Sequence, residues 1–381
     1  MKYLIISDAA SAHVYNFVKN MLSGRGYEIY LLRHSIRKIP EQYARFYEEN
    51  HITVFSPGDE SEGRSIFDTI RRFVRKLRFM KKLGRVDVCH IHYLHRSSCL
   101  IYLLFRANIE RLILSYWGTD ILRPTKKEII AQEKCFPFAN RITVTVEHSK
   151  DVFRQRYGLK YDDKLTFGRF AAGSIPAIKE YVKTTTKSQC RMEFHIPEGK
   201  LCVVCGYNAD PSQHQDQCLH EISLLPEGMK ERIHVLIPMQ YGRINMQYIN
   251  NVKHAAKESG CSYEVLEEYV PFERNATMCL ATDIYLQLRD SDAFSNAMKE
   301  QVYSGSYMIQ GDWLIYEELD QINAPVKKIR SISELHTALI ETITTINFSD
   351  KISLFEPIYN IFSMDSVRKN WDEILESVVG K

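Results

Sequence analysis

The chain has 381 residues, of which 45% are hydrophobic and 25% are charged, and its formal net charge is +3. This length suits two domains, and this composition is typical of a folded protein, which excludes disordered and fibrous classes. The low net charge argues against a protein that coats nucleic acid, and we expect no nucleic-acid partner.

Targeting signals and cysteine usage indicate the cellular compartment. No apolar run approaches the roughly 20 residues that cross a bilayer, and the opening MKYLIISDAA is too short for the core of a signal peptide. Nine cysteines without paired spacing favour reduced thiols over a disulfide framework. Cys202 and Cys205 in LCVVC are expected on opposite faces of a strand, which disfavours a zinc or redox pair. We therefore expect a cytoplasmic protein.

The first half of the chain alternates short strands with helical patterns. Strands are predicted at residues 3–6, 27–32, 86–92, 111–117 and 141–146. Between the first two of these strands, apolar residues recur at helical spacing, and glycines then end the pattern. This alternation implies a mostly parallel sheet with helices on both faces.

A basic amphipathic helix is predicted between Arg64 and Arg85. Arginine and lysine dominate this segment, Asp68 is its acid, and Gly84 ends it. Apolar residues recur at helical spacing: Ile66, Phe67, Ile70, Phe73, Val74, Leu77 and Met80. Two interpretations stay open, namely a core-facing stripe with a solvated cationic back, and attachment to an anionic membrane surface. The membrane-facing residues would be Arg71, Arg72, Arg75, Lys76, Lys81 and Lys82.

The segment HIHYLH raises the question of a metal site. His90 and His92 are expected on one face of a strand, with His95 just beyond it. No nearby cysteine or glutamate completes a ligand set of regular spacing, so we expect structural histidines and no metal.

The second half repeats the pattern after a polar stretch at residues 183–190. Strands are predicted at residues 201–208, 233–239, 282–288 and 306–312, and helices at 248–257 and 293–304. We expect two Rossmann-like domains that face a central cleft: an acceptor domain at 1–185, a linker at 186–200, and a donor domain at 201–355. A C-terminal helix at 356–381 would pack back on the first domain, with Phe362, Val367, Trp371, Ile374 and Leu375 inward.

Residues just after strands are the candidates for a binding site in such sheets. Asp292 and Glu300 belong to the loop and helix that follow the predicted strand at 282–288. A helix N-terminus binds anions, so a diphosphate would suit this loop, and Glu300 lies two turns into the helix, where it could bind a ribose. The alternative is that Asp292 caps the helix and that Glu300 is a solvated helix residue.

The arrangement DAFSNAMKEQVYSGSYMI resembles the donor-site signature of GT-B glycosyltransferases, in which the second acid holds the nucleotide ribose. The first acid is Asp292, where glutamate is usual. The segments LSYWGTDIL, GYNADPSQHQDQCLHEI and VLIPMQYGRINMQYINNV are similar to parts of the bacterial 4-acetamido-4,6-dideoxygalactose transferases of enterobacterial common antigen synthesis. The resemblance is strongest from Gly206 to Asp312.

This resemblance implies a GT-B fold and a transferase that uses a nucleoside diphosphate sugar without a metal. The implied acceptor is a bacterial surface saccharide linked to polyprenyl diphosphate at the inner face of the membrane. Undiminished transfer in excess chelator is the expected result. The donor residues would be Glu300, Asp292, Ser295, Asn296, Asn208, Ser212, His214, Tyr241, Gly242 and Arg289.

The catalytic base is expected in the first half, close to the acceptor hydroxyl. Asp120, in YWGTD, is the leading candidate, followed by His13 and Asp8; the alternative for Asp120 is a helix N-cap. Two other classes remain open: a sugar-nucleotide epimerase or hydrolase, and a non-catalytic partner subunit of a transferase. The latter is suggested by the lack of arginine and lysine between Gly206 and Glu221.

Overall fold

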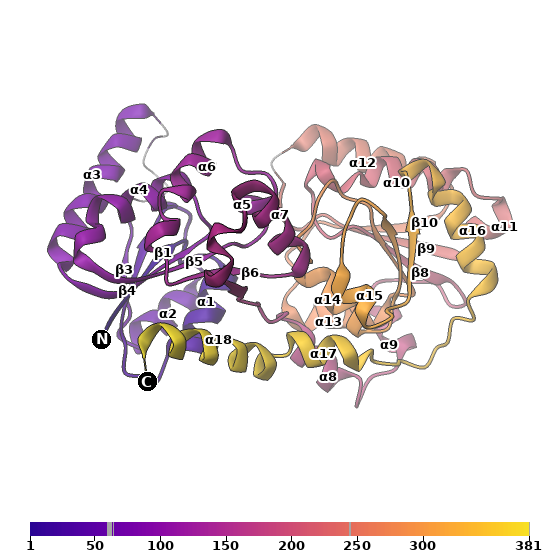
Figure 1. Cartoon of the computed structure of the whole chain (residues 1–381). Coiled ribbons are helices and arrows are strands. Elements are labelled where there is room, and N and C mark those ends of the chain that lie inside the picture. Colours follow the sequence, from indigo (N-terminus) through magenta and orange to yellow (C-terminus); the bar gives the residue numbers. More distant parts are fainter. Residues whose placement is uncertain (59–62, 64, 244, 381) are drawn as a thin grey trace. The chain divides into compact units, whose positions relative to one another are not determined.

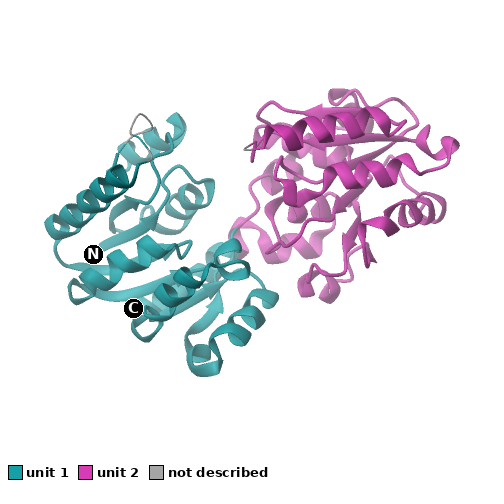
Figure 2. Cartoon of the chain, turned by 90° about the horizontal axis from the view of Figure 1, so that it is seen from above, with its two compact units in different colours: residues 1–170, 367–381 teal, residues 171–366 magenta. Residues whose placement is uncertain are grey.

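The computed structural model describes residues 1–58, 63, 65–243 and 245–380. The chain forms two compact units (Figure 2): unit 1 contains residues 1–170 and 367–381, and unit 2 contains residues 171–366. Residues 187–193, within the segment expected to be a linker, form helix α9 of unit 2.

Unit 1 is built on a parallel sheet of seven strands in the order β3-β2-β1-β4-β5-β6-β7. The strands are β1 (Lys2–Ser7), β2 (Glu28–Arg33), β3 (Thr53–Phe55), β4 (Val86–His92), β5 (Ile109–Ser115), β6 (Arg141–Val144) and β7 (Leu165–Phe167). The direction of strand addition reverses between β1 and β4, and open α/β sheets bind ligands outside the carboxyl ends of the strands at such a point.

Helices cover both faces of this sheet (Figure 1). One face carries α3 (Ile66–Leu83), α4 (Arg96–Phe105), α5 (Thr119–Leu122), α6 (Lys126–Glu133) and α7 (Glu147–Tyr157). The other face carries α1 (Ala12–Phe17), which a π-helical turn continues to Leu22, α2 (Glu41–Glu49), and the last helix of the chain, α18 (Met364–Val379).

Strand β4 shows how alternation divides its side chains between the two faces. Cys89 and Ile91 belong to the core beneath α3 and α4. His90 and His92 point the opposite way, toward Phe17, whose ring centroid lies 5.2 Å from that of His90 and 4.7 Å from that of His92. The His90 ring donates or accepts at Tyr3 Oη (2.9 Å) and Ser115 Oγ (2.6 Å), as expected for a structural histidine.

Unit 2 has a six-stranded parallel sheet in the order β10-β9-β8-β11-β12-β13, which reverses between β8 and β11. The strands are β8 (Leu201–Cys205), β9 (Ile233–Pro238), β10 (Ser262–Leu266), β11 (Ile284–Gln287), β12 (Tyr307–Gly311) and β13 (Val326–Ile329). One face carries α10 (Gln215–Ser223), α12 (Met246–Glu258) and α16 (Leu335–Thr345). The other carries α8 (Ile175–Tyr181), α9 (Lys187–Glu193), α13 (Phe272–Ala281), α14 (Asn296–Tyr303) and α17 (Glu356–Phe362). The short helices α11 (Glu227–Lys230) and α15 (Glu317–Gln321) lie in connections.

The expectation of two parallel α/β units is confirmed, and every predicted strand is present, with ends that differ from the predicted ones by at most three residues. The strands that the sequence pattern missed are β3, β7, β10 and β13, which are the edge strands of the two sheets. An edge strand of a covered sheet is half exposed, so these segments lack the continuous apolar run that marks a central strand.

The predicted helix at residues 293–304 begins later than expected, at Asn296. The Asp292 carboxylate accepts a hydrogen bond from the Ser295 amide (2.7 Å), and Phe294 has a positive φ of 60°. This local turn holds residues 293–295 outside the helix, because a left-handed residue cannot continue it.

Helix α3 is present and ends at Gly84, as predicted, but its two ends differ in burial. Met80 and Leu83 are buried, whereas Ile66, Phe67 and Ile70 are exposed (71%, 78% and 56%). The core-facing interpretation therefore describes only its C-terminal part. Lys76 was expected to face a membrane, and this was wrong: its side chain is buried on the inner side of the helix.

All nine cysteines are free, and eight of them are buried. Across the residues that the structure describes, none of the helices combines the length and the apolar character needed to cross a bilayer.

Candidate functional site

In unit 2, the loops after β8 and β11 join at the point where the strand order reverses. The Arg289 guanidinium donates to Tyr207 Oη, to Ser212 Oγ (3.2 Å) and to Asp292 Oδ1 (3.4 Å). The Asp290 amide donates to the Ser212 carbonyl (3.0 Å). These contacts bring three of the predicted donor residues together at the carboxyl ends of the central strands, where the predicted site was expected.

Asp292 accepts four hydrogen bonds within this cluster. Its Oδ1 accepts from Tyr207 Oη (3.1 Å) and from Arg289, and its Oδ2 accepts from the Ser295 amide (2.7 Å) and from Tyr316 Oη (3.1 Å). Burial raises the pKa of the Asp292 carboxyl above its usual value, although the Arg289 charge opposes this shift. The carboxylate thus fixes the loop before α14 and is not the N-cap itself, since Ser295 occupies that position.

The N-terminus of α14 adds donors beside this cluster. The first amides of any α-helix lack an intrahelical acceptor, and the helix dipole favours an anion there. Ser295 Oγ is buried and has no hydrogen-bond partner among the described residues, while Asn296 Oδ1 accepts from Lys299 Nζ (3.3 Å). The loop therefore presents amides, a hydroxyl group and the guanidinium of Arg289 to one region.

Glu300 lies buried on α14 and faces other protein groups. Its Oε1 accepts from the Ser174 amide (2.8 Å), and its Oε2 accepts from Asn275 Nδ2 (2.8 Å). Burial raises its pKa, which these hydrogen bonds oppose. The alternative of a solvated helix residue is wrong, because only 5% of Glu300 is exposed.

The loop after β8 supplies the other predicted donor residues. His214 Nε2 lies 2.7 Å from Asp290 Oδ1, which links this residue to the same cluster. Asn208 Oδ1 accepts from the Asp210 amide (3.0 Å), so this side chain folds back on its own loop.

The loop after β9 meets the loop after β8. The Ala209 amide donates to the Tyr241 carbonyl (2.8 Å), and Gly242 has a φ of +76° with its α-carbon facing the backbone of Asp210. Tyr241 is 56% exposed, and its ring lies 6.4 Å from that of Tyr207. Two aromatic rings, one of them largely open, thus flank the cluster around Arg289.

The predicted donor residues do not include several partners in this site: Tyr207, Asp290, Asn275 and Ser174. Tyr207 directly follows Gly206 at the end of β8, which is a signal that could have found it. Asn275 and Ser174 come from α13 and from the turn before α8, and no local pattern relates them to Glu300.

The three candidate bases of unit 1 have different surroundings. The Asp8 carboxylate contacts Arg37 (3.0 Å) and Arg33 (3.4 Å). Burial acts to raise the pKa of Asp8, but the Ala10 amide and the two arginine charges outweigh it, so that this pKa lies below its usual value. The His13 ring is partly exposed and lies 5.2 Å from that of Trp117.

Asp120 is bound by backbone amides on both oxygens. It accepts from Leu94 (2.8 Å), Trp117 (2.9 Å) and Gly118 (2.9 Å). Burial raises the pKa of the Asp120 carboxyl to about 6, although the amides favour its charged form. Asp120 lies in the first turn of α5, and the N-cap is Gly118, so this carboxylate joins the loops after β4 and β5 and does not act as the cap residue.

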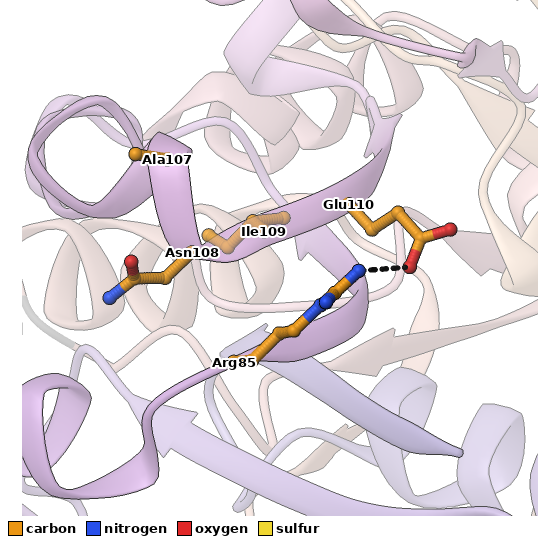
Figure 3. Close-up of a pocket in the computed structure, with 5 residues that line it drawn as sticks. All are labelled: Arg85, Ala107, Asn108, Ile109 and Glu110. Carbon is orange, nitrogen blue, oxygen red and sulfur yellow. Dashed lines mark hydrogen bonds and ion pairs between the residues drawn. The ribbon is translucent and has the colours of Figure 1, made fainter.

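The cavity in Figure 3 lies at the amino-terminal end of the central strands of the unit 1 sheet. It has a volume of about 220 Å³ and is lined by Arg85, Ala107, Asn108, Ile109 and Glu110. Arg85 and Glu110 form an ion pair (3.5 Å). These residues surround the amino ends of β4 and β5, whereas α/β sheets bind ligands at the carboxyl ends of their strands.

Within the described ranges 1–58, 63, 65–243 and 245–380, no group of three or more histidine, cysteine, aspartate or glutamate side chains is arranged to hold a metal ion.

Comparison with known proteins identifies the fold. The sequence matches no protein-family profile and no curated protein sequence. Among solved structures, a glycosyltransferase from Rickettsia africae has a TM-score of 0.71 at 10% identity, with 99% of this chain and 98% of that chain covered. Alr3699/HepE from Anabaena, in complex with UDP and glucose, has a TM-score of 0.70 at 12% identity, with 99% and 100% covered.

A third neighbour is sucrose-phosphate synthase from Thermosynechococcus elongatus, with a TM-score of 0.66, 10% identity, and 98% and 94% of the two chains covered. These similarities extend over nearly the whole length of each chain. The chain therefore has the GT-B fold, which confirms the fold class expected from the sequence.

Proposed function

We propose that this chain is a glycosyltransferase that moves a sugar from a nucleoside diphosphate sugar to a bacterial surface saccharide. Unit 2 would bind the donor and unit 1 the acceptor, without a bound metal ion. The acceptor would be linked to polyprenyl diphosphate, as in the 4-acetamido-4,6-dideoxygalactose transferases that the sequence resembles. The protein would act from the cytoplasm at the inner face of the membrane.

The observation that carries this proposal is the cluster at the strand reversal of unit 2. Arg289, Ser212 and the N-terminus of α14 supply donors suited to a diphosphate. The complexes of Alr3699/HepE with UDP and with UDP-glucose support the same ligand class on the same fold. The exposed ring of Tyr241 would stack on the base.

Glu300 would bind the ribose of the donor. An ionised carboxylate has about four acceptor positions, and Ser174 and Asn275 occupy two of them. The remaining lone pairs would accept from the vicinal hydroxyl groups. In this arrangement Asn275 and the Ser174 amide orient the carboxylate, while Asp292 holds the loop that positions the diphosphate.

The base in unit 1 would be His13. Asp120 and Asp8 are both buried (4% and 9% exposed), whereas His13 is partly exposed next to Trp117. A partly exposed imidazole can accept the proton of an acceptor hydroxyl near neutral pH.

A binding measurement tests the donor site directly. We expect nucleoside diphosphates and their sugars to raise the melting temperature, since they bind only the native state. Replacing Glu300 by Gln removes one charged acceptor at similar volume and should weaken donor binding by about tenfold to a hundredfold. Glu227→Gln is the matched control, because Glu227 lies exposed on α11, away from the strand carboxyl ends.

Assays with the same proteins separate the alternatives. Rapid hydrolysis or epimerisation of the donor without an acceptor would favour an epimerase or hydrolase. Full donor affinity and partner activity in Glu300→Ala would favour a non-catalytic subunit. Transfer that fails in excess chelator and returns with manganese would contradict the metal-independent part of the proposal.

A further inference from the structure

In unit 1, basic side chains gather where the sheet reverses its strand order. Arg33 ends β2, and His34 and Arg37 follow it, while His95 follows β4. Lys76, on the inner side of α3, lies close enough to His34 and His95 for its charge to act on both. None of these side chains takes part in the donor site, which lies in unit 2.

The acid in contact with this group is Asp8, which follows β1. Its carboxylate contacts Arg37 (3.0 Å) and Arg33 (3.4 Å), and Arg33 also donates to Ser56 Oγ (2.8 Å). One carboxylate against Arg33, Arg37 and Lys76 leaves two positive charges uncompensated among these residues. Arg37 is 61% exposed at its side chain, so part of the group is open to solvent.

Lys76 is the unusual member of the group. It is 6% exposed, and its ammonium forms no hydrogen bond or ion pair with any residue in the described part of the chain. Burial, together with the Arg72 charge, lowers the pKa of Lys76 to about 8, so it is still mostly charged at neutral pH. Only a small part of Lys76 reaches water. A largely buried charge without a partner is unfavourable, and a bound anion would reduce this cost.

The two histidines lie close to this ammonium. Burial lowers the pKa of His34 to about 4 and that of His95 below its usual value, and the Lys76 charge adds to both shifts. The imidazole rings stack at 6.1 Å with an angle of 19° between their planes. His34 Nδ1 is buried and has no hydrogen-bond partner among the described residues. Glu128 acts on His95 as a further negative charge.

We propose that Lys76, His34 and Arg37 form a binding site for a phosphate or diphosphate group at the carboxyl ends of β1, β2 and β4. A phosphate group carries about two negative charges near neutral pH and several acceptor oxygens, which match two uncompensated cations and their free donors. A carboxylate would balance only one of these charges. The site thus takes the phosphorylated end of the acceptor, and this assignment to the acceptor rests on the proposed function.

Titration calorimetry with inorganic diphosphate tests this site on the full chain, with UDP present in excess so that the donor cluster of unit 2 is occupied. We expect a Kd of about 1 mM or tighter for the native protein. Lys76→Met removes the charge at similar volume and should weaken binding at least tenfold. Arg78→Met, an exposed position on the same helix, should bind like the native protein. Arg37→Met should also weaken binding. Because the Arg37 side chain is 61% exposed, we expect this variant to fold normally.

Two soluble ligands distinguish the source of the phosphate. Tighter binding of a short prenyl diphosphate than of a hexose phosphate would assign the site to a lipid-linked acceptor, and the reverse order would assign it to a soluble sugar phosphate. Native affinity in both Lys76→Met and Arg37→Met, or no binding to the native chain, would overturn the site.

The donor measurements keep the two proposals apart. If the native chain binds nucleotide sugars but shows no diphosphate binding in unit 1, the proposed phosphate site is wrong and the proposed function stands. If the native chain binds diphosphate but no nucleotide sugar, the proposed function is wrong and the phosphate site stands.

Discussion

Asp283 illustrates how this chain handles charge at the scale of single residues. Its side chain is fully buried, and it pairs with Lys187 Nζ (2.6 Å) and Arg191 Nη2 (2.7 Å). The Cys202 amide also donates to it (2.7 Å). The carboxylate thus connects α9 to β8 and to the start of β11 in unit 2.

Replacing Asp283 by Ala should destabilise unit 2 by about 3–5 kcal/mol, because two largely buried cations and an amide lose their acceptor. Urea denaturation followed by circular dichroism measures this change. Asp350→Ala is the matched control: Asp350 also pairs with Arg191 (2.7 Å), but its side chain is 78% exposed, so the loss should be about 1 kcal/mol or less. Equal losses in the two variants would show that burial does not decide the value of this ion pair.

Buried acids at the site follow the same principle. Asp292 and Glu300 were identified from their spacing, and the structure shows both of them buried. Their partners Tyr207, Tyr316, Asn275 and Ser174 come from segments far away in the sequence. Spacing along the chain could therefore predict the acids, but it carried no information about the groups that orient them.

At the scale of elements, α3 combines two surface properties. Its N-terminal part exposes Ile66, Phe67 and Ile70, and Arg71, Lys81 and Lys82 are exposed along the same helix. Arg72 and Arg75 are less exposed and donate to the Gly63 and Pro57 carbonyls. Apolar and basic side chains on one exposed helix suit the interface of an anionic membrane, which supports the peripheral location in the proposed function.

A vesicle-binding assay examines this role of α3. We expect sedimentation with vesicles that contain anionic lipid and weaker binding at high salt, since basic residues near the headgroups each contribute about 1 kcal/mol. Phe67→Ser should reduce the partition coefficient by about tenfold or more, because a buried aromatic ring contributes about 1.5–3 kcal/mol.

Leu159→Ser provides the control for this assay, because Leu159 is also exposed (70%) but lies outside α3. Binding that is the same for Phe67→Ser and for the native chain, and that high salt does not weaken, would contradict the membrane role.

At the scale of the whole molecule, the end of the chain completes the first unit. Residues 367–379 of α18 belong to unit 1, where Trp371 is fully buried against Phe17 (4.8 Å between ring centroids). Trp371 Nε1 donates to the Arg169 carbonyl (2.8 Å), and Asn370 Nδ2 donates to the Phe167 carbonyl (3.0 Å). Unit 1 therefore cannot reach its native packing before residues 367–379 are synthesised.

Trp371→Ala should lower the stability of unit 1 by about 3–5 kcal/mol through the lost ring and the cavity it leaves. Scanning calorimetry should show an earlier transition for unit 1 and an unchanged one for unit 2. Lys369→Ala, on the exposed side of α18, should leave both transitions in place. A shift confined to the unit 2 transition would contradict the assignment of α18 to unit 1.

The sequence by itself determined the class of fold and the central strands. Periodicity and strand–helix alternation are local properties, and a strand buried on both faces must be apolar along its whole length. The same reasoning could not find β3, β7, β10 and β13, because a partly exposed edge strand needs no such run.

Only the tertiary structure decided which charged residues are exposed and which are buried. Lys76 belongs to a basic helix by its sequence, but the packing of α3 against unit 1 buries it near His34. Likewise, Asn275 and the Ser174 amide meet Glu300 only after the chain has folded. Burial and hydrogen-bond partners depend on segments distant in sequence, and for this reason the pattern around one residue cannot specify them.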